Sequence, residues 1–237
     1  MPPRLFVFAG RFGSGKTESA VNFAVQLAQG HYLTDKGWGT MPAAFNAHPM
    51  LVDLDIVTPY FRSRELSEAL GVLGVQVVAP AAIGRYLDLP AIAPEILGAI
   101  EQRSQIVVLD VGGDPQGARA LGQYASAIES QEYAAYFIVN PYRPFTDTLD
   151  GVRAAIREVE ATSRLKMTAL VSNPNLMDET TLELVLSGHQ RVLGVSEDIG
   201  LPVALLCVDR GLAEQIRPRI SGVPILEIQR FFDLHWT

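Results

Sequence analysis

The sequence predicts an α/β protein in which a doubly wound, mostly parallel sheet carries helices on both faces. Short apolar runs alternate with segments of helical periodicity along the chain, which is the order of strand–helix–strand units. A glycine-rich turn joins the first apolar run to the first helix, and several later runs end in aspartate or asparagine. This order leaves no separate second unit, so we expect residues 1–237 to form a single domain.

The first apolar run is a strand, Leu5–Phe8, and a helix is predicted over residues 18–29. The turn between them fits the phosphate-binding P-loop pattern G-x-x-x-x-G-K-S/T. Its glycines let backbone N–H groups converge on phosphate oxygens, and the helix N-terminus adds positive partial charge. The sequence therefore predicts a P-loop NTPase fold. The expected nucleotide-binding residues here are Gly10, Arg11, Phe12, Gly13, Ser14, Gly15, Lys16, Thr17 and Glu18.

Two of these side chains have expected roles of their own. Lys16 is expected to reach the β- and γ-phosphates of the nucleotide and to act in catalysis. The Thr17 hydroxyl is expected to bind Mg²⁺. The motif therefore predicts a nucleotide together with Mg²⁺ as the cofactors of this protein.

Composition narrows the class of protein further. The net charge is −7 and the pI is about 5.1, so we expect no basic surface for nucleic acid. The one cysteine, Cys207, lies in an apolar run, which suits a reducing cytoplasm and argues against a metal cluster held by thiolates. The chain opens without a signal peptide, and no apolar run approaches the ~20 residues that span a bilayer. We therefore expect a cytoplasmic protein that does not bind membranes.

The second strand follows a long connection. Residues 30–49 contain three glycines, two prolines and two histidines without a clear period, so we expect a solvated loop away from the nucleotide, or else a partner contact. The strand at residues 50–55 ends in Asp53 and Asp55. We expect Asp55 to act as metal ligand and catalytic residue, with Asp53 turned to the other face. The alternative is a capped turn before a helix at residues 63–73.

A short strand at residues 75–79 and a second long connection lead to a helix that starts near Pro94. The next strand, residues 105–110, is apolar enough to be buried on both faces of the sheet. It ends in Asp110, the Walker B position, which binds Mg²⁺ directly or through water. Gly113 follows at the D-x-x-G spacing, where its N–H can meet the γ-phosphate of the nucleotide.

The remaining chain completes the strand–helix pattern. A helix is expected to begin at Asp114 and Pro115, as N-cap and first residue. Strands follow at residues 133–140, 166–173 and 201–208, with helices that reach about residue 161 and start at about residue 178. Because parallel strands share one carboxyl edge, their terminal side chains are expected to border the P-loop. These side chains are Asp55, Asp110, Asn140, Asn173 and Asp209.

Three further features concern the base and the partner. An asparagine amide donates and accepts at once, so Asn173 is expected to contact a purine base, unless it only forms an Asn–Pro turn. Residues 60–64 and 142–145 mix aromatic side chains with arginine. We expect both segments to rim the nucleotide face and to contact a partner; packing of their own helices is the alternative. The segment 225–236 is expected to pack onto the domain rather than on a membrane.

These motifs together resemble the MinD/ParA-like branch of P-loop proteins, the SIMIBI class, over most of the chain. The resemblance is specific at the P-loop, at the strand end Val52–Asp55 and at Asp110 with its glycines. It extends to uncharacterised MinD-like ATP-binding proteins that share Asp-Leu-Asp-Ile-Val and Pro-Tyr-Phe-Arg-Ser-Arg-Glu. It implies Mg²⁺ at Thr17 and Asp110, water or the metal shell at Asp55, and the base at Asn173.

The chain departs from this branch in two places. Many members carry a lysine five residues before the P-loop lysine, which reaches the nucleotide of a second subunit. Arg11 stands at that position, so a catalytic, finger-like role in a homodimer is implied for it, and Phe12 replaces a glycine. Guanine specificity usually needs Asn-Lys-x-Asp, whereas Asn173 is followed by Pro-Asn-Leu. We therefore expect ATP rather than GTP.

The sequence thus predicts a Mg²⁺-dependent protein that binds and hydrolyses ATP as a switch on a protein partner. The alternative is an ATP-dependent synthetase or kinase for a small carboxylic acid, similar to the cobyrinic-acid and dethiobiotin synthetases. Arg62, Arg64 and Arg143 could form the acid pocket of such an enzyme. A third hypothesis is a nucleotide-binding regulator that scarcely hydrolyses its ligand.

Overall fold

The centre of the protein is a parallel sheet. A computed structural model describes residues 2–55, 67–78 and 94–231. The sheet strands are β1 (Leu5–Gly10), β4 (Met50–Leu54), β5 (Gln76–Val78), β6 (Val107–Val111), β7 (Tyr133–Val139), β8 (Ala169–Ser172), β9 (Val203–Asp209) and β10 (Ile225–Ile228). Their order is β10-β9-β8-β7-β1-β6-β4-β5, and every neighbouring pair runs parallel. The predicted doubly wound sheet is confirmed.

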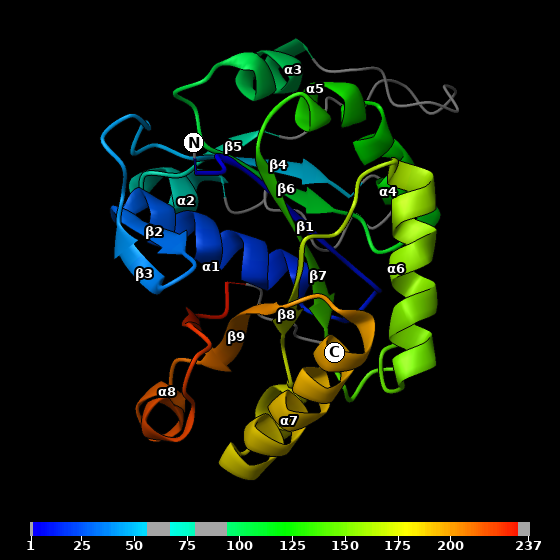
Figure 1. The fold of residues 1–237 in the computed structure, drawn as a ribbon. Helices are drawn as coiled ribbons and strands as arrows, with labels where there is room; N and C mark the ends of the chain where they lie inside the picture. Colours follow the sequence, from blue (N-terminus) through cyan, green and yellow to red (C-terminus); the bar gives the residue numbers. More distant parts are fainter. Residues whose placement is uncertain (1, 56–66, 79–93, 232–237) are drawn as a thin grey trace, which may run out of the picture.

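Helices cover both faces of this sheet. They are α1 (Lys16–Ala28), α2 (Ser67–Val72), α3 (Pro94–Glu101), α4 (Pro115–Gly122), α5 (Ala125–Glu129), α6 (Leu149–Ser163), α7 (Leu182–Ile199) and α8 (Ala213–Ile216). One apolar core joins the sheet to α3, α4, α5 and α6, and a second joins it to α1 on the other face. Figure 1 shows α1 and α6 on opposite sides of the sheet. Strands buried on both faces explain the apolar runs of the sequence.

Aromatic side chains fix α1 to the sheet. Phe23 of α1 packs against Phe6 and Phe8 of β1, with ring centroids 4.9 and 5.2 Å apart. Tyr136 of β7 meets Phe8 at 5.4 Å. These pairs bury large apolar areas and prefer the tilted and edge-on arrangements found here. They hold the helix that follows the P-loop in a fixed position.

The connection at residues 30–49 is not the solvated loop that the sequence predicted. It forms an antiparallel hairpin of β2 (His31–Thr34) and β3 (Gly37–Thr40), with Thr34 opposite Gly37. Tyr32 of the hairpin is buried in the core around α1. The Thr34 hydroxyl accepts from the N–H of Lys36 and donates to the carbonyl of Gly37, which closes the turn. The strands are too short to give a clear period, so the sequence pattern missed them.

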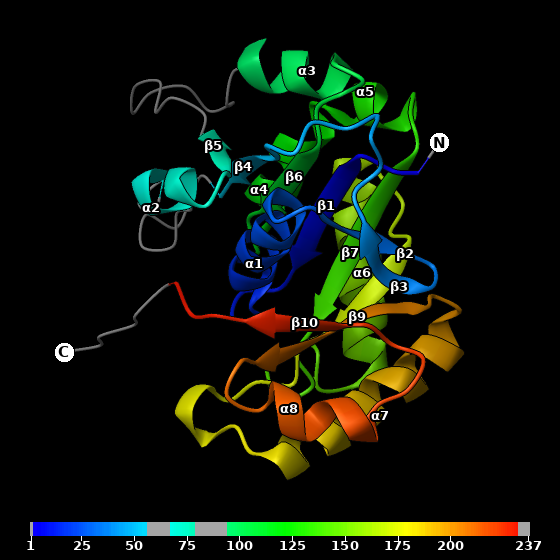
Figure 2. The same cartoon turned by 90° about the vertical axis from the view of Figure 1, so that its left-hand side faces the viewer.

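The C-terminal segment packs onto the sheet as an edge strand. β10 is the edge strand next to β9, and Figure 2 shows the two strands close together. The indole N–H of Trp38 in β3 donates to the carbonyl of Ile225 at 2.8 Å, so hairpin and edge strand support each other. Asn22 of α1 exchanges two hydrogen bonds with the backbone of Gln229, each 2.9 Å long. The predicted packing holds for residues 225–231; residues 232–236 lie outside the described part of the chain.

Helix boundaries follow local capping chemistry. Helix α3 begins at Pro94, and Asp114 caps α4 by accepting from the N–H groups of Gln116 and Gly117, as predicted. The helix expected from about residue 178 instead begins at Leu182, because a 3₁₀ turn occupies Met177–Glu179. The predicted helix start at residue 63 and the segment 60–64 lie outside the described residues.

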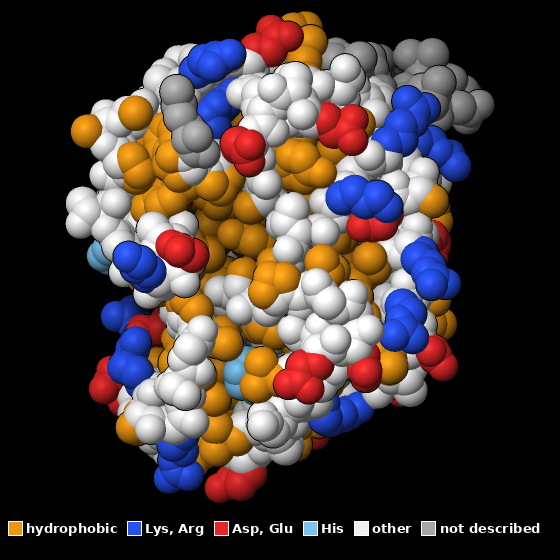
Figure 3. Space-filling view, in the orientation of Figure 1, with side chains coloured by type: hydrophobic (Ala, Val, Ile, Leu, Met, Phe, Trp, Pro, Cys, Tyr) orange, Lys and Arg blue, Asp and Glu red, His pale blue; other side chains and the backbone are white. Residues whose placement is uncertain are grey.

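Charge is mixed on the face drawn in Figure 3. Apolar side chains gather near the middle of this face, while Lys or Arg and Asp or Glu alternate around its rim. Within the described part of the chain, no helix is both long and apolar enough to cross a membrane.

A substitution at Gly117 tests how closely α4 packs on the chain that follows β6. A Cβ there would lie 2.5 Å from the Cα of Gly112 and 2.6 Å from its N and O, all of them backbone atoms. We expect Gly117→Ala to lower the free energy of unfolding by about 1–3 kcal/mol, as overpacking does. Gly194→Ala in α7 is the control, because nothing lies within 4 Å of its Cβ position. That control should gain roughly 0.5–1 kcal/mol. Urea titrations in which both variants shift alike would contradict the packing argument.

Candidate phosphate-binding site

The P-loop leaves β1 and enters α1 through residues that must be glycine. Gly13 and Gly15 have φ values of 76° and 85°, in the left-handed region. A Cβ at Gly15 would lie 2.2 Å from the Nδ2 atom of Asn173. A Cβ at Gly10 would lie 2.7 Å from the Ser14 hydroxyl oxygen. The loop is therefore pressed between β7, β8 and its own turn, with the first turn of α1 at its end.

Asp110 is the most unusual side chain of this site. It lies opposite Phe8 of β1 and is fully buried, and neither carboxylate oxygen receives a well-formed hydrogen bond, although the Thr17 hydroxyl interacts with the carboxylate. Burial raises the pKa of Asp110 to about 7; the charge of Lys16 acts in the opposite direction, and that of Asp53 adds to the rise. A buried carboxylate beside a P-loop lysine fits a cation site, because carboxylate oxygens are ligands of Mg²⁺.

Asp55 and Asp53 lie beside Asp110. Both charges raise the pKa of Asp110, so the three carboxylates share one region. Asp53 Oδ1 accepts from the N–H of Asp55 at 2.9 Å, which fixes the end of the strand. Among the described residues, no group of three His, Cys, Asp or Glu side chains forms a metal-ligand set. The three neighbouring carboxylates therefore do not form a metal-ligand set by themselves.

Gly113 brings the turn after β6 against the P-loop. A Cβ at this position would lie 2.7 Å from the backbone N of Phe12 and 3.1 Å from its Cα. A Cβ at the preceding Gly112 would lie 3.4 Å from the Oδ1 atom of Asp55. The D-x-x-G segment thus touches both the phosphate loop and the acidic strand end.

Asn173 reaches the P-loop from the end of β8. Its Nδ2 donates to the carbonyl of Ser14 at 2.6 Å, and the side chain is buried. Asn140 and Asp209 were also expected at the P-loop, but their hydrogen bonds lead elsewhere. Asn140 joins the backbones of Tyr142 and Asn175, while Asp209 pairs with Arg230. The two side chains therefore stabilise the loops that follow their strands.

Two P-loop residues contact other parts of the same chain. Arg11 Nη2 lies 2.6 Å from Glu158 Oε2 of α6, and its guanidinium stacks on Phe145 at 5.7 Å. The expected reach of Arg11 toward a second subunit stays a prediction. The Glu18 carboxylate accepts from the N–H of Phe231 at 3.0 and 3.2 Å. Neither contact could be predicted from the sequence, because each joins residues more than a hundred positions apart.

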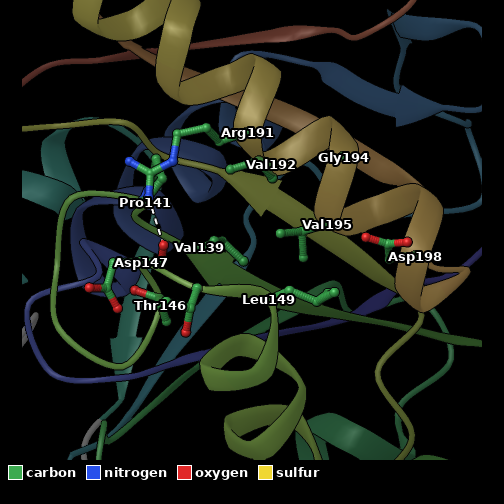
Figure 4. Close-up of a pocket in the computed structure, with 11 residues that line it drawn as sticks. Val139, Pro141, Thr146, Asp147, Leu149, Arg191, Val192, Gly194, Val195 and Asp198 are labelled. Atoms are coloured by element: carbon green, nitrogen blue, oxygen red, sulfur yellow. Dashed lines mark hydrogen bonds between the residues drawn. The ribbon is translucent and has the colours of Figure 1, made fainter.

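A separate cavity of about 270 Å³ lies between α6 and α7. Figure 4 shows Val139, Leu149 and Val195 at its centre, with Asp198 at one end. At the other end, Arg191 donates to the carbonyl of Asp147 at 2.6 Å. P-loop residues do not line this cavity.

Comparison with solved structures places the fold. The cell division protein FtsY of Thermotoga maritima matches 87% of this chain with 15% identity and a TM-score of 0.52. The signal recognition particle receptor FtsY of Elizabethkingia anophelis, solved in complex with GDP, matches 88% with 17% identity and a TM-score of 0.53. This chain covers 62% and 57% of those chains, respectively. At these identities the likeness concerns the fold, which is that of the P-loop NTPases.

Comparisons of sequence add no relative. No protein-family model matches this chain, and neither does any curated protein.

The buried carboxylate of Asp110 should cost stability at neutral pH. Its folded pKa of about 7 lies above the ordinary value of 3.8, so the folded state holds the proton to higher pH than the unfolded state. The free energy of unfolding should therefore fall as pH rises from about 4 to 7. We expect Asp110→Asn to raise it at pH 8 by about 1–3 kcal/mol, allowing for an unpaired amide.

Denaturant titrations of the nucleotide-free protein at pH 5 and pH 8 measure this effect. Asp35→Asn is the matched control, because Asp35 is an exposed aspartate of the hairpin turn. An Asp110→Asn variant that is less stable than wild type at pH 8 would contradict the assignment of Asp110 as a buried charge that its neighbours compensate only in part.

Proposed function

We propose that this protein binds and hydrolyses a nucleoside triphosphate, ATP, with Mg²⁺, as a switch on a protein partner. The observation that carries the proposal is the buried carboxylate of Asp110, which receives no well-formed hydrogen bond and interacts with Lys16 and the Thr17 hydroxyl. Such a group is costly unless a bound cation or its water shell satisfies it. The P-loop around it supplies the complementary site for phosphate.

Each residue of the loop has a separate task in this proposal. Backbone N–H groups at the start of α1 and the Lys16 ammonium hold the phosphates. Thr17 and Asp110 would hold Mg²⁺, which draws charge from the phosphate oxygens when it is bound. The tight contact between Gly113 and the backbone of Phe12 fixes the loop before the ligand arrives. Little reorganisation is then needed on binding.

Asp55 is proposed to orient the attacking water. It stands at the end of β4, separated from β1 by β6 alone, and its backbone is fixed by Asp53. A carboxylate in this position accepts a hydrogen bond from water and can receive its proton as the bond to phosphorus forms. The roles of Asp55 in the metal shell and in catalysis are thus linked through one side chain.

The choice of ATP rests on the loops after β8 and β9. Guanine presents N–H donors that a free carboxylate accepts, and Asp178 and Asp209 stand in these loops. Arg230 pairs with both of them, at 3.4 Å between its Nε and Asp209 Oδ2. Asn173 keeps Oδ1 for the adenine amino group while its Nδ2 bonds to Ser14. The GDP recorded with FtsY of Elizabethkingia anophelis makes GTP the rival nucleotide.

The switch function is supported by the surface beside the P-loop. Phe12 and Phe145 are 66% and 69% exposed, a feature of surfaces that bind partners.

The likeness to FtsY supports the broader SIMIBI class rather than the MinD/ParA-like branch. With Arg11 tied to Glu158, a homodimer would need other contacts across the nucleotide. Burial raises the pKa of the Cys207 thiol to about 12, which suits an inert cysteine in a cytoplasmic protein.

The rival enzyme is a synthetase or kinase that transfers phosphate to a small carboxylic acid. Arg143 favours it, because this cation lies next to Gly13 of the P-loop. Arg62 and Arg64, which would complete the acid pocket, lie outside the described residues.

Lys16→Ala tests the phosphate site. Nucleotide at 100 times its Kd should stabilise the wild-type protein by about 2.7 kcal/mol. The variant should lose this gain, because the ammonium that faces the phosphates is gone. Thermal unfolding with and without Mg-ATP measures it, and Lys36→Ala in the exposed hairpin turn is the control. Equal stabilisation of Lys16→Ala and wild type would refute the site.

Competitive titration tests the base. We expect ATP to bind more tightly than GTP, because Arg230 occupies the carboxylates that guanine would need. Arg230→Ala should free Asp209 and narrow the difference between the two nucleotides. A wild-type preference for GTP would overturn the choice of ATP while leaving the phosphate site intact.

Asp55→Asn separates binding from turnover. The amide keeps the shape of the side chain but cannot take a proton, so we expect ATP to bind while hydrolysis slows about 10²-fold or more. Single-turnover rates with saturating Mg-ATP provide the measurement. An unchanged rate, or complete loss of binding, would exclude the water-orienting role.

A further inference from the structure

The loop between β7 and α6 is held in a defined shape by its own hydrogen bonds. The N–H of Arg143 donates to the carbonyl of Asn140 at 3.1 Å. The Thr146 hydroxyl donates to the same carbonyl at 2.7 Å, and the Asn140 side chain accepts from the N–H of Tyr142 at 3.1 Å. Arg143 therefore projects from a fixed turn directly after the strand that neighbours β1.

The Arg143 side chain lies over the P-loop. Its Cδ and Nε atoms are each 3.9 Å from the position that a Cβ of Gly13 would take. Gly13 has no side chain to separate them, so the guanidinium stem rests on the glycine backbone. The Nε atom is buried and has no hydrogen-bond partner among the described residues. A buried donor of this kind is unfavourable unless a further acceptor completes it.

The two arginines beside the P-loop differ in their charge partners. Arg11 is neutralised by Glu158 at 2.6 Å and is stacked on Phe145. The ion pairs among the described residues give Arg143 no such acid. Arg143 therefore remains available to an anion that enters the loop.

We propose that Arg143 contacts the terminal phosphate of the bound nucleoside triphosphate, as an arginine supplied by the same chain. The inference rests on the proposed nucleotide site. A planar guanidinium can place two parallel N–H groups on one phosphate and keeps its charge at any physiological pH. A nucleoside triphosphate carries more negative charge than a diphosphate, and the positive charge of Arg143 attracts the additional phosphate. The residue thereby distinguishes the two nucleotide states that a switch must tell apart.

The test is the affinity of the full chain for ADP and for a non-hydrolysable ATP analogue, each with Mg²⁺, measured by isothermal titration calorimetry. Arg143→Ala should weaken analogue binding by about tenfold or more and change ADP binding by less than about twofold. Arg143→Lys should retain part of the analogue affinity. Arg157→Ala removes the same charge from the exposed face of α6 and should change neither.

Each outcome decides the matter. Unchanged analogue affinity in Arg143→Ala overturns the inference, and so does an equal loss for both nucleotides, which indicates a purely structural role. Wild-type protein that binds neither nucleotide refutes the proposed function itself, and the inference falls with it. If the alanine variant does not fold, Arg143→Gln retains much of the side-chain length and provides the same comparison.

Discussion

The structure depends on the buried carboxylate of Asp110, to which no well-formed hydrogen bond is directed. Asp110 stands near the end of β6, next to β1, and is fully buried. A protein that only had to fold would gain stability from an apolar residue there. The retained charge therefore points to a ligand that completes it, and the P-loop beside it supplies the place for that ligand. Stability is given up locally so that the site is ready before binding.

The rest of the fold keeps the P-loop and Asp110 in fixed positions. Phe6, Phe8 and Phe23 lock α1 to β1, which fixes the direction in which the P-loop N–H groups point. Backbone contacts that admit only glycine, at Gly15 and Gly113, close the distance between the P-loop, β8 and the turn after β6. On the outer side, Trp38 joins the hairpin to the edge strand and packs on Phe23 in the middle of α1. Packing, rather than the ligand, keeps the loop in place.

The sequence predicted those parts of the site that depend on local pattern. Three features could be predicted, because each depends on residues that are close together in the sequence. They are the P-loop, the apolar strand before Asp110 and the capping of α4 by Asp114. The hairpin at residues 31–40 was missed, since strands this short have no reliable period. The pairing of Arg11 with Glu158 could not be predicted either, because it depends on how α6 packs. For the same reason, the sequence could not show that Asn140 and Asp209 bind neighbouring loop residues.

The central claim is that residues 10–17 bind the phosphates of a nucleotide. A crystal structure with Mg²⁺ and a non-hydrolysable ATP analogue tests it most directly. The account predicts phosphate oxygens within hydrogen-bond distance of the Lys16 ammonium and of backbone N–H groups of the loop, with Asp110 joined to the metal directly or through water. A nucleotide bound in the cavity between α6 and α7, with the P-loop empty of phosphate, would contradict it.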